Sequence, residues 1–172
     1  MSVLVQEIIL ADYAFVIHTT NPSTDDCSEI YAEVVKGLGE TLVGAYSGRA
    51  LSFIVKKSDL SKPIIQGYPS KRIGLFIKQS IIFRSDSNGE DLEDKYMTTS
   101  LVPCTHGFRG IDEKVVDYCS DPLLLNLYFQ KSVLSKIAAA GATIEEVYGS
   151  PQDIEGVIKD GELYVVQTRP QM

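Results

Sequence analysis

The stretch Gly156-Val-Ile-Lys-Asp-Gly-Glu-Leu-Tyr-Val-Val-Gln167 predicts the clearest structural element of this 172-residue chain. Two segments rich in Val, Ile, Leu and Tyr flank Lys159-Asp160-Gly161, and an Asp-Gly pair supplies the positive φ angles that a tight turn requires. The stretch is therefore expected to form a β-hairpin.

Upstream of this hairpin, several short apolar stretches predict further strands. Such stretches lie at residues 2–9, 13–20, 50–56 and 74–83, the last long enough for one or two strands. Residues 29–36 are apolar at alternate positions only in part, so the pattern leaves their structure open. Residues 57–71 are polar and contain two prolines, so they are expected to form a surface connection.

One long helical pattern lies between residues 121 and 147. Apolar residues recur there at roughly helical spacing, with Gly141 as a candidate break. Asp121 and Pro122 are a favourable pair for the cap and first turn of this helix. Helix and strands together predict a single α+β unit over residues 1–172, with a mixed or antiparallel sheet and one long helix near the carboxy terminus.

Composition narrows the class of protein. The formal net charge is −7, which argues against a sequence-independent nucleic-acid binder, because such proteins need a basic face to displace phosphate counterions. No apolar run approaches the roughly 20 residues that span a bilayer, so no membrane partner is expected. Three cysteines and two histidines show no ligand spacing, which favours reduced thiols over a structural metal site.

The terminal hairpin also carries a pattern of polar residues. Asp153 and Glu155 lie two apart, as do Gln167 and Arg169, so each pair is expected to point to one face of its strand. Carboxylate and amide oxygens are hard ligands for Mg²⁺, and arginine neutralises phosphate oxygens. The alternative is a surface hairpin with a salt bridge worth less than about 1 kcal/mol and no function.

Two blocks around this hairpin carry a family resemblance. Ser150-Pro-Gln-Asp-Ile-Glu-Gly156 and Gly161-Glu-Leu-Tyr-Val-Val-Gln-Thr-Arg-Pro170 resemble the signature that ends the nucleotide-binding domain of the pyruvate phosphate dikinase and phosphoenolpyruvate synthase family. The resemblance implies an ATP-grasp-like fold, of which this chain would hold the carboxy-terminal part. It also implies ATP or phosphate contacts for Asp153 and Arg169, and Mg²⁺ ligation by Glu155 and Gln167.

Three further segments resemble the same family. Gly37-Leu-Gly-Glu40 resembles its glycine-rich segment, where Glu40 would accept a hydrogen bond from a ribose hydroxyl. Phe83-Arg-Ser-Asp-Ser-Asn-Gly-Glu-Asp-Leu92 resembles its phosphate loop and implies phosphate contacts for Arg84 and Ser85. Val5-Gln6-Glu7 resembles the strand that passes the adenine and implies an ATP contact for Gln6. Taken alone, the glycine-rich segment and the loop fit ordinary turns equally well.

Over nearly its whole length the chain is similar to the branch of this family that phosphorylates starch. The resemblance implies Mg²⁺ and ATP, transfer of the β-phosphate to an α-glucan through an upstream phosphohistidine, water as the second acceptor, and a plastid stroma location. No catalytic residue is then expected in this chain, and His18 is expected to be structural. An inert nucleotide-binding fragment and a pyruvate-type dikinase are the alternatives. Residues 94–112 depart from the glycine-rich run of the family, so the resemblance carries no role there.

Overall fold

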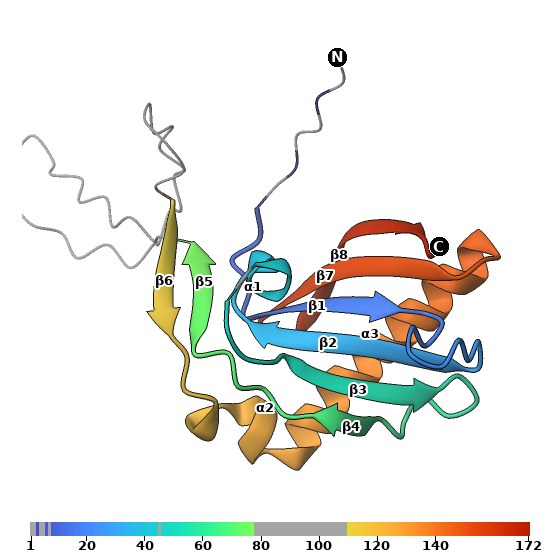
Figure 1. Cartoon of the computed structure of the whole chain (residues 1–172), viewed down its shortest axis with the longest axis horizontal. Coiled ribbons are helices and arrows are strands. Elements are labelled where there is room, and N and C mark those ends of the chain that lie inside the picture. Colours follow the sequence, from blue (N-terminus) through green and yellow to red (C-terminus); the bar gives the residue numbers. More distant parts are fainter. Residues whose placement is uncertain (1–2, 4–5, 7, 45, 78–109) are drawn as a thin grey trace, which may run out of the picture.

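The structure, a computed structural model, describes residues 3, 6, 8–44, 46–77 and 110–172 (Figure 1). Its centre is an antiparallel sheet of six strands in the order β4-β3-β2-β1-β7-β8. The strands are β1 (Tyr13–His18), β2 (Glu29–Lys36), β3 (Leu51–Lys56), β4 (Ile64–Gly67), β7 (Gln152–Lys159) and β8 (Glu162–Pro170). The predicted antiparallel arrangement is therefore confirmed.

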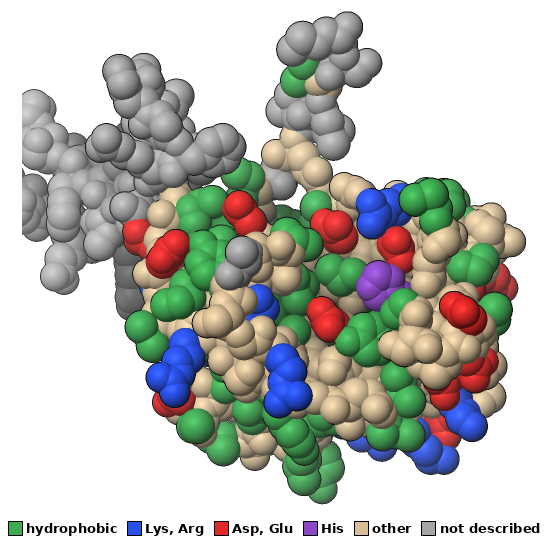
Figure 2. All heavy atoms as spheres, viewed as in Figure 1, with side chains coloured by type: hydrophobic (Ala, Val, Ile, Leu, Met, Phe, Trp, Pro, Cys, Tyr) green, Lys and Arg blue, Asp and Glu red, His purple; other side chains and the backbone are tan. Residues whose placement is uncertain are grey.

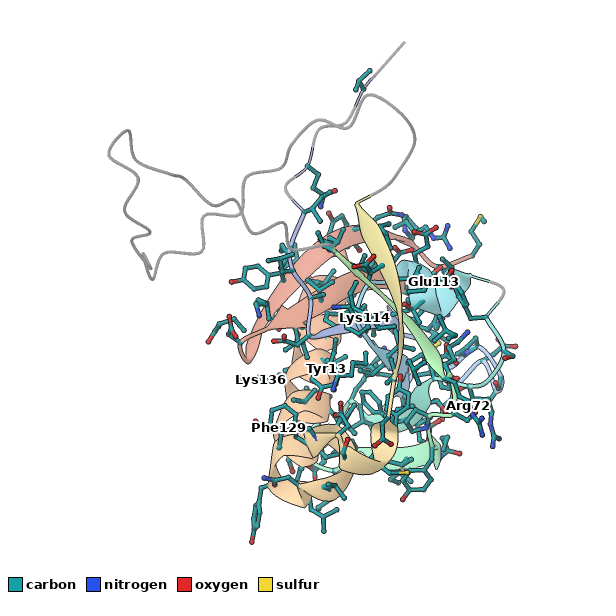
Figure 3. All side chains as sticks on the ribbon, turned by 90° about the vertical axis from the view of Figure 1, so that its left-hand side faces the viewer. Tyr13, Arg72, Glu113, Lys114, Phe129 and Lys136 are labelled. Carbon is teal, nitrogen blue, oxygen red and sulfur yellow. The ribbon has the colours of Figure 1, made fainter. Side chains whose placement is uncertain are left out.

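One face of the sheet packs against the long helix α3 (Leu127–Tyr148), which lies behind the sheet in Figure 1. Tyr13 of β1 and Phe129 of α3 approach each other in this layer, with ring centroids 6.3 Å apart (Figure 3). Gly141 lets the helix come close to β1, because a Cβ there would lie 3.0 Å from the Ile17 side chain. The main core consists of alternate strand residues and one stripe of α3, among them Phe15, Ile17, Ile30, Val34, Phe53, Leu134, Ile137 and Ile154.

Among the described residues, the short helix α1 (Glu40–Val43) and its neighbours cover part of the opposite face. Ile9, Leu38 and Leu42 pack there on a second core, made of Ala11, Ala14, Val35, Ala50 and Val157. We call the rest of this face, as the described residues form it, the open face. It carries the side chains of His18, Tyr31, Glu33, Asp153, Glu155, Gln167 and Arg169. A separate two-stranded sheet, β5 (Ile73–Ile77) and β6 (Ile111–Val115), stands at the end of the molecule where α1 lies (Figure 1).

The predicted long helix between residues 121 and 147 is present, but the predicted start at Asp121 and the candidate break at Gly141 are wrong. Asp121 caps a separate short helix, α2 (Pro122–Leu125), which follows the 3₁₀ turn η1 (Tyr118–Ser120). Asn126 then leaves helical geometry, with φ −112° and ψ 99°, and caps α3 with its side chain. α3 runs without interruption through Gly141, because that glycine serves close packing and not a turn.

The strand predictions at 13–20 and 50–56 are confirmed, and residues 29–36 form β2. The prediction at 74–83 is confirmed by β5 as far as residue 77, and its remainder lies outside the described residues. The predicted connection at 57–71 contains β4, an edge strand bracketed by Pro63 and Pro69, as edge strands allow. Among the described residues, no helix is long and apolar enough to cross a membrane.

The predicted strand at 2–9 is wrong for the described residues of that stretch, which form no strand. Val3 and Ile8 are exposed, whereas Ile9 packs on the second core. An apolar run by itself does not separate a strand from a segment that docks through its side chains. The Gln6 side-chain amide donates a hydrogen bond to the Val166 carbonyl of β8.

Candidate functional site

The register of the β7–β8 hairpin brings the four predicted polar residues together on the open face. Asp153 lies opposite Arg169, and Glu155 lies opposite Gln167. Ile154, the residue between Asp153 and Glu155 on β7, points the other way and is buried in the main core. The expected pairing of two acids with an amide and a guanidinium is therefore present in the structure.

Asp153 is the most connected residue of this group. Its Oδ1 lies 2.7 Å from Nδ1 of His18, and its Oδ2 lies 3.4 Å from Nε of Arg169. The His18 contact follows from sheet order, since β1 is the other neighbour of β7 and His18 lies directly opposite Asp153. The Asp153 side chain is 17% exposed, against 29% for His18 and 65% for Arg169.

β2 adds two polar residues to the same face. The Tyr31 hydroxyl donates to Oε1 of Glu33 at 2.7 Å, and the Tyr31 ring packs beside His18 with centroids 6.0 Å apart. Burial first, and then the Glu33 carboxylate, raises the pKa of Tyr31 to about 12, so the phenol keeps its proton at neutral pH. Figure 2 shows acidic side chains and a histidine gathered on this side of the molecule.

A pocket of about 260 Å³ adjoins these polar residues. Five parts of the chain build it: the segment around Gln6, the middle of β1, the loop before α1 with α1 itself, and strands β7 and β8. Its lining is mainly apolar and consists of Gln6, Ile8, Ile9, Phe15, Val16, Leu38, Gly39, Val43, Glu155, Gly156, Val157 and Val166. Glu155 belongs both to the pocket and to the polar group, so the two form one continuous site.

An irregularity in β8 shapes the pocket wall. Glu155 pairs with Gln167 and Gly156 pairs with Val165, so Val166 is an extra residue, a β-bulge. The Val166 carbonyl accepts a hydrogen bond of 3.1 Å from the Gln6 side-chain amide, and both residues line the pocket. The bulge thus ties the amino-terminal segment to the last strand at the pocket.

Glu40, Arg84 and Ser85 complete the set of predicted site residues. Glu40 is exposed at the first turn of α1, and it is the preceding Gly39 that lines the pocket. Arg84 and Ser85 lie outside the described residues. The structure therefore brings together Gln6, Asp153, Glu155, Gln167 and Arg169, while the roles of all these residues stay predictions.

The donor set of the open face fits Mg²⁺ only in company with another ligand. Among the described residues, no group of three or more His, Cys, Asp and Glu side chains is placed to hold a metal ion. Mg²⁺ is commonly bound by one or two carboxylates together with substrate phosphates and water, not by an all-protein cage. Glu155 and Gln167 offer one carboxylate and one amide for such a shared site.

Comparison with known proteins defines the class. Residues 1–172 match the family described as the AMP/ATP-binding domain of pyruvate phosphate dikinase. The chain belongs to this family.

Individual relatives fall into two groups. The chain is 69% identical over 176 residues to the alpha-glucan water dikinase, chloroplastic, of Solanum tuberosum, and 67% identical over 175 residues to the alpha-glucan water dikinase 1, chloroplastic, of Arabidopsis thaliana. It is 27% identical over 175 residues to a probable phosphoenolpyruvate synthase of Methanocaldococcus jannaschii. These alignments cover 99–100% of the chain but only 12% of each relative.

Sequence reasoning did not assign His18, Tyr31 or Glu33 to the site. Alternation along β1 and β2 places them on one face, but their approach to Asp153 depends on β7 pairing with β1 across more than a hundred residues. No local pattern carries that register. The sequence signal for His18 was its polar side chain within the otherwise apolar stretch that forms β1, at a position expected to face away from the core.

Proposed function

We propose that the chain binds Mg–ATP on the open face, with the base in the pocket and the phosphates over the β7–β8 hairpin. The observation that carries this proposal is the position of Glu155, which lines the pocket and lies opposite Gln167. A nucleotide has an apolar, flat base and a charged tail, and the site offers an apolar slot beside a polar group in that same sequence. The fold is then the carboxy-terminal part of an ATP-grasp-like domain.

The pocket supports the base-binding half of this proposal. Its lining residues are mainly aliphatic, and aliphatic side chains favour an apolar ring system over water. Gly39 and Gly156 belong to the lining, and the Gln6 amide gives the slot a polar rim. Glu40, one residue beyond Gly39, is placed by the proposal at the ribose.

The charges of the open face support the metal-bound form of the nucleotide. Among the described residues around the hairpin, the carboxylates of Glu33, Asp153 and Glu155 outnumber the guanidinium of Arg169, so a bare polyphosphate would be repelled there. Glu155 and Gln167 would hold Mg²⁺, which when bound would neutralise part of the phosphate charge. Arg169 would contact the phosphates directly, and the family pattern adds Arg84 and Ser85 to them.

We further propose that the chain is the nucleotide-binding segment of a longer α-glucan, water dikinase in the plastid stroma. Such an enzyme would transfer the β-phosphate of ATP to starch glucan through a phosphohistidine of another domain, and the γ-phosphate to water. The 69% identity to a glucan, water dikinase, against 27% to a phosphoenolpyruvate synthase, supports this substrate over pyruvate.

Isothermal titration of the chain with Mg–ATP tests the binding proposal. We expect saturable heat at or below millimolar nucleotide, and loss of most of the affinity when a chelator removes Mg²⁺. The absence of any heat at millimolar Mg–ATP would instead identify the chain as an inert fragment.

Glu155→Gln tests the proposed role of the hairpin. Removing the carboxylate takes away a charged ligand, so we expect Mg–ATP affinity to fall at least tenfold, which corresponds to about 1.4 kcal/mol. Glu162→Gln is the matched control, because Glu162 is an exposed acid at the far end of the same hairpin, opposite Lys159. Equal Mg–ATP affinities of the two variants would show that Glu155 does not take part in binding.

A further inference from the structure

The His18–Asp153–Arg169 group on the open face has an arrangement that the proposed function does not by itself require. Resting on that function, we propose that His18 is a further contact residue for the terminal phosphates of the nucleotide. Asp153 is then a positioning residue that orients both His18 and Arg169. Its effect on the nucleotide is transmitted through these two side chains.

The order of burial in the group supports this division of roles. Asp153 is the least exposed member at 17%, while His18 and Arg169 are 29% and 65% exposed. A ligand that approaches the open face therefore meets the two nitrogen-bearing side chains before it meets the carboxylate. Each carboxylate oxygen of Asp153 is already in contact with one of them, Oδ1 with His18 and Oδ2 with Arg169.

The hydrogen bond to Asp153 also fixes the direction of the His18 ring. Nδ1 faces the carboxylate at 2.7 Å, so Nε2 on the other side of the ring is directed away from it. Among the residues that the structure describes, Nε2 has no hydrogen-bond partner. The Tyr31 ring lies beside the imidazole, with ring centroids 6.0 Å apart. In the imidazolium form Nε2–H is a donor for a phosphate oxygen.

The position of His18 along the sheet selects the end of the nucleotide that it contacts. Val16 lies opposite Glu155 and lines the pocket, whereas His18 lies opposite Asp153, one pleat repeat farther along both strands. That step is about 7 Å. A base in the pocket and a metal-bound phosphate at Glu155 leave the terminal phosphates to the row of His18, Asp153 and Arg169.

The test compares ATP with AMP, because a general disturbance of the fold would weaken both. His18→Asn keeps an amide near the position of Nδ1 but lacks Nε2, so we expect Mg–ATP affinity to fall about tenfold and AMP affinity to stay unchanged. His18→Gln restores an amide near Nε2 and should recover part of the ATP affinity. Asp153→Asn should lower ATP affinity selectively as well, and the effects of Asp153→Asn and His18→Asn should not add.

A second measurement uses the unmodified chain. It contains two histidines, so its imidazole proton signals are assigned by comparison with His18→Gln. We expect the His18 signal to shift with Mg–ATP and not with AMP. Binding of Mg–ATP with no shift of this signal and no loss in His18→Asn would overturn the inference but leave the proposed function standing. Failure of the unmodified chain to bind any nucleotide would overturn both.

Discussion

Gly156 is the residue at which β1, β7 and β8 leave no room for a side chain. A Cβ at this position would lie 2.2 Å from Cζ of Phe15 and 2.6 Å from the Tyr164 carbonyl oxygen. The first contact belongs to the main core and the second to the backbone of β8, so neither yields easily. Gly156 therefore holds the hairpin against β1 immediately beside Glu155.

We predict that Gly156→Ala lowers the free energy of unfolding by about 1–3 kcal/mol, the usual cost of overpacking a core. Urea unfolding followed by circular dichroism measures the change. Gly110→Ala is the matched control, since a Cβ at Gly110 would meet none of the described residues within 4 Å. Equal stability of the two variants would show that the hairpin moves away from β1 at no cost.

At the scale of elements, α3 depends on a cap that lies five residues after the predicted one. Asn126 accepts hydrogen bonds of 3.1 Å from the backbone N–H groups of Tyr128 and Phe129. Gly149 closes the other end in left-handed geometry, with φ +67° and its N–H donating to the Glu145 carbonyl. Both ends of the helix that supports the sheet are thus satisfied locally.

We predict that Asn126→Ala destabilises the chain by about 1 kcal/mol, because two backbone donors of α3 lose their acceptor. Asn126→Asp should retain most of the stability, since aspartate caps helices equally well. Thermal unfolding of the three proteins provides the comparison. If Asn126→Ala and Asn126→Asp share one melting temperature below that of the unmodified chain, loss of the helix cap does not explain the destabilisation.

The elements that sequence predicted correctly are those specified by neighbouring residues. Alternation and the Asp160-Gly161 turn were enough for the terminal hairpin and for the common face of Asp153 and Glu155. Sheet order, the bulge at Val166 and the break at Asn126 were not predictable in this way. They depend on which distant surfaces pack together, and a single sequence contains no local pattern for that choice.

At the scale of the whole molecule, a buried carboxylate joins the sheet to the helical layer. Asp121 is fully buried, caps α2, accepts a hydrogen bond of 2.6 Å from the Tyr13 hydroxyl and forms an ion pair with Lys36. Burial first, and then the bond to Asp121, raises the pKa of Tyr13 far above its ordinary value of 10.0. The folded protein therefore keeps this phenol proton where the unfolded chain loses it.

The raised pKa of Tyr13 makes the stability of the folded chain depend on pH in the alkaline range. Above about pH 10 unfolding releases the Tyr13 proton, so this residue's contribution to stability, complete at lower pH, declines as pH rises. We predict that Tyr13→Phe has a lower free energy of unfolding than the unmodified chain at neutral pH. Above pH 10 the free energy of unfolding of the unmodified chain should fall more steeply than that of Tyr13→Phe, by about 1.4 kcal/mol per pH unit. Denaturant unfolding between pH 8 and 11 measures how the free energy of unfolding of each protein changes with pH. Tyr128→Phe, a change at an exposed tyrosine, is the control, and equal slopes in all three proteins would contradict the prediction.

The sheet order also has a consequence for how the protein is made. β1 lies between β2, which follows it closely in sequence, and β7, whose Gln152 is 133 residues beyond its partner Thr19. At a synthesis rate of about 5–20 residues per second, one edge of β1 waits on the order of ten seconds on the ribosome for its partner strand. During that interval an apolar strand edge is open to other nascent chains, and a chaperone that shields it would raise the yield of folded protein.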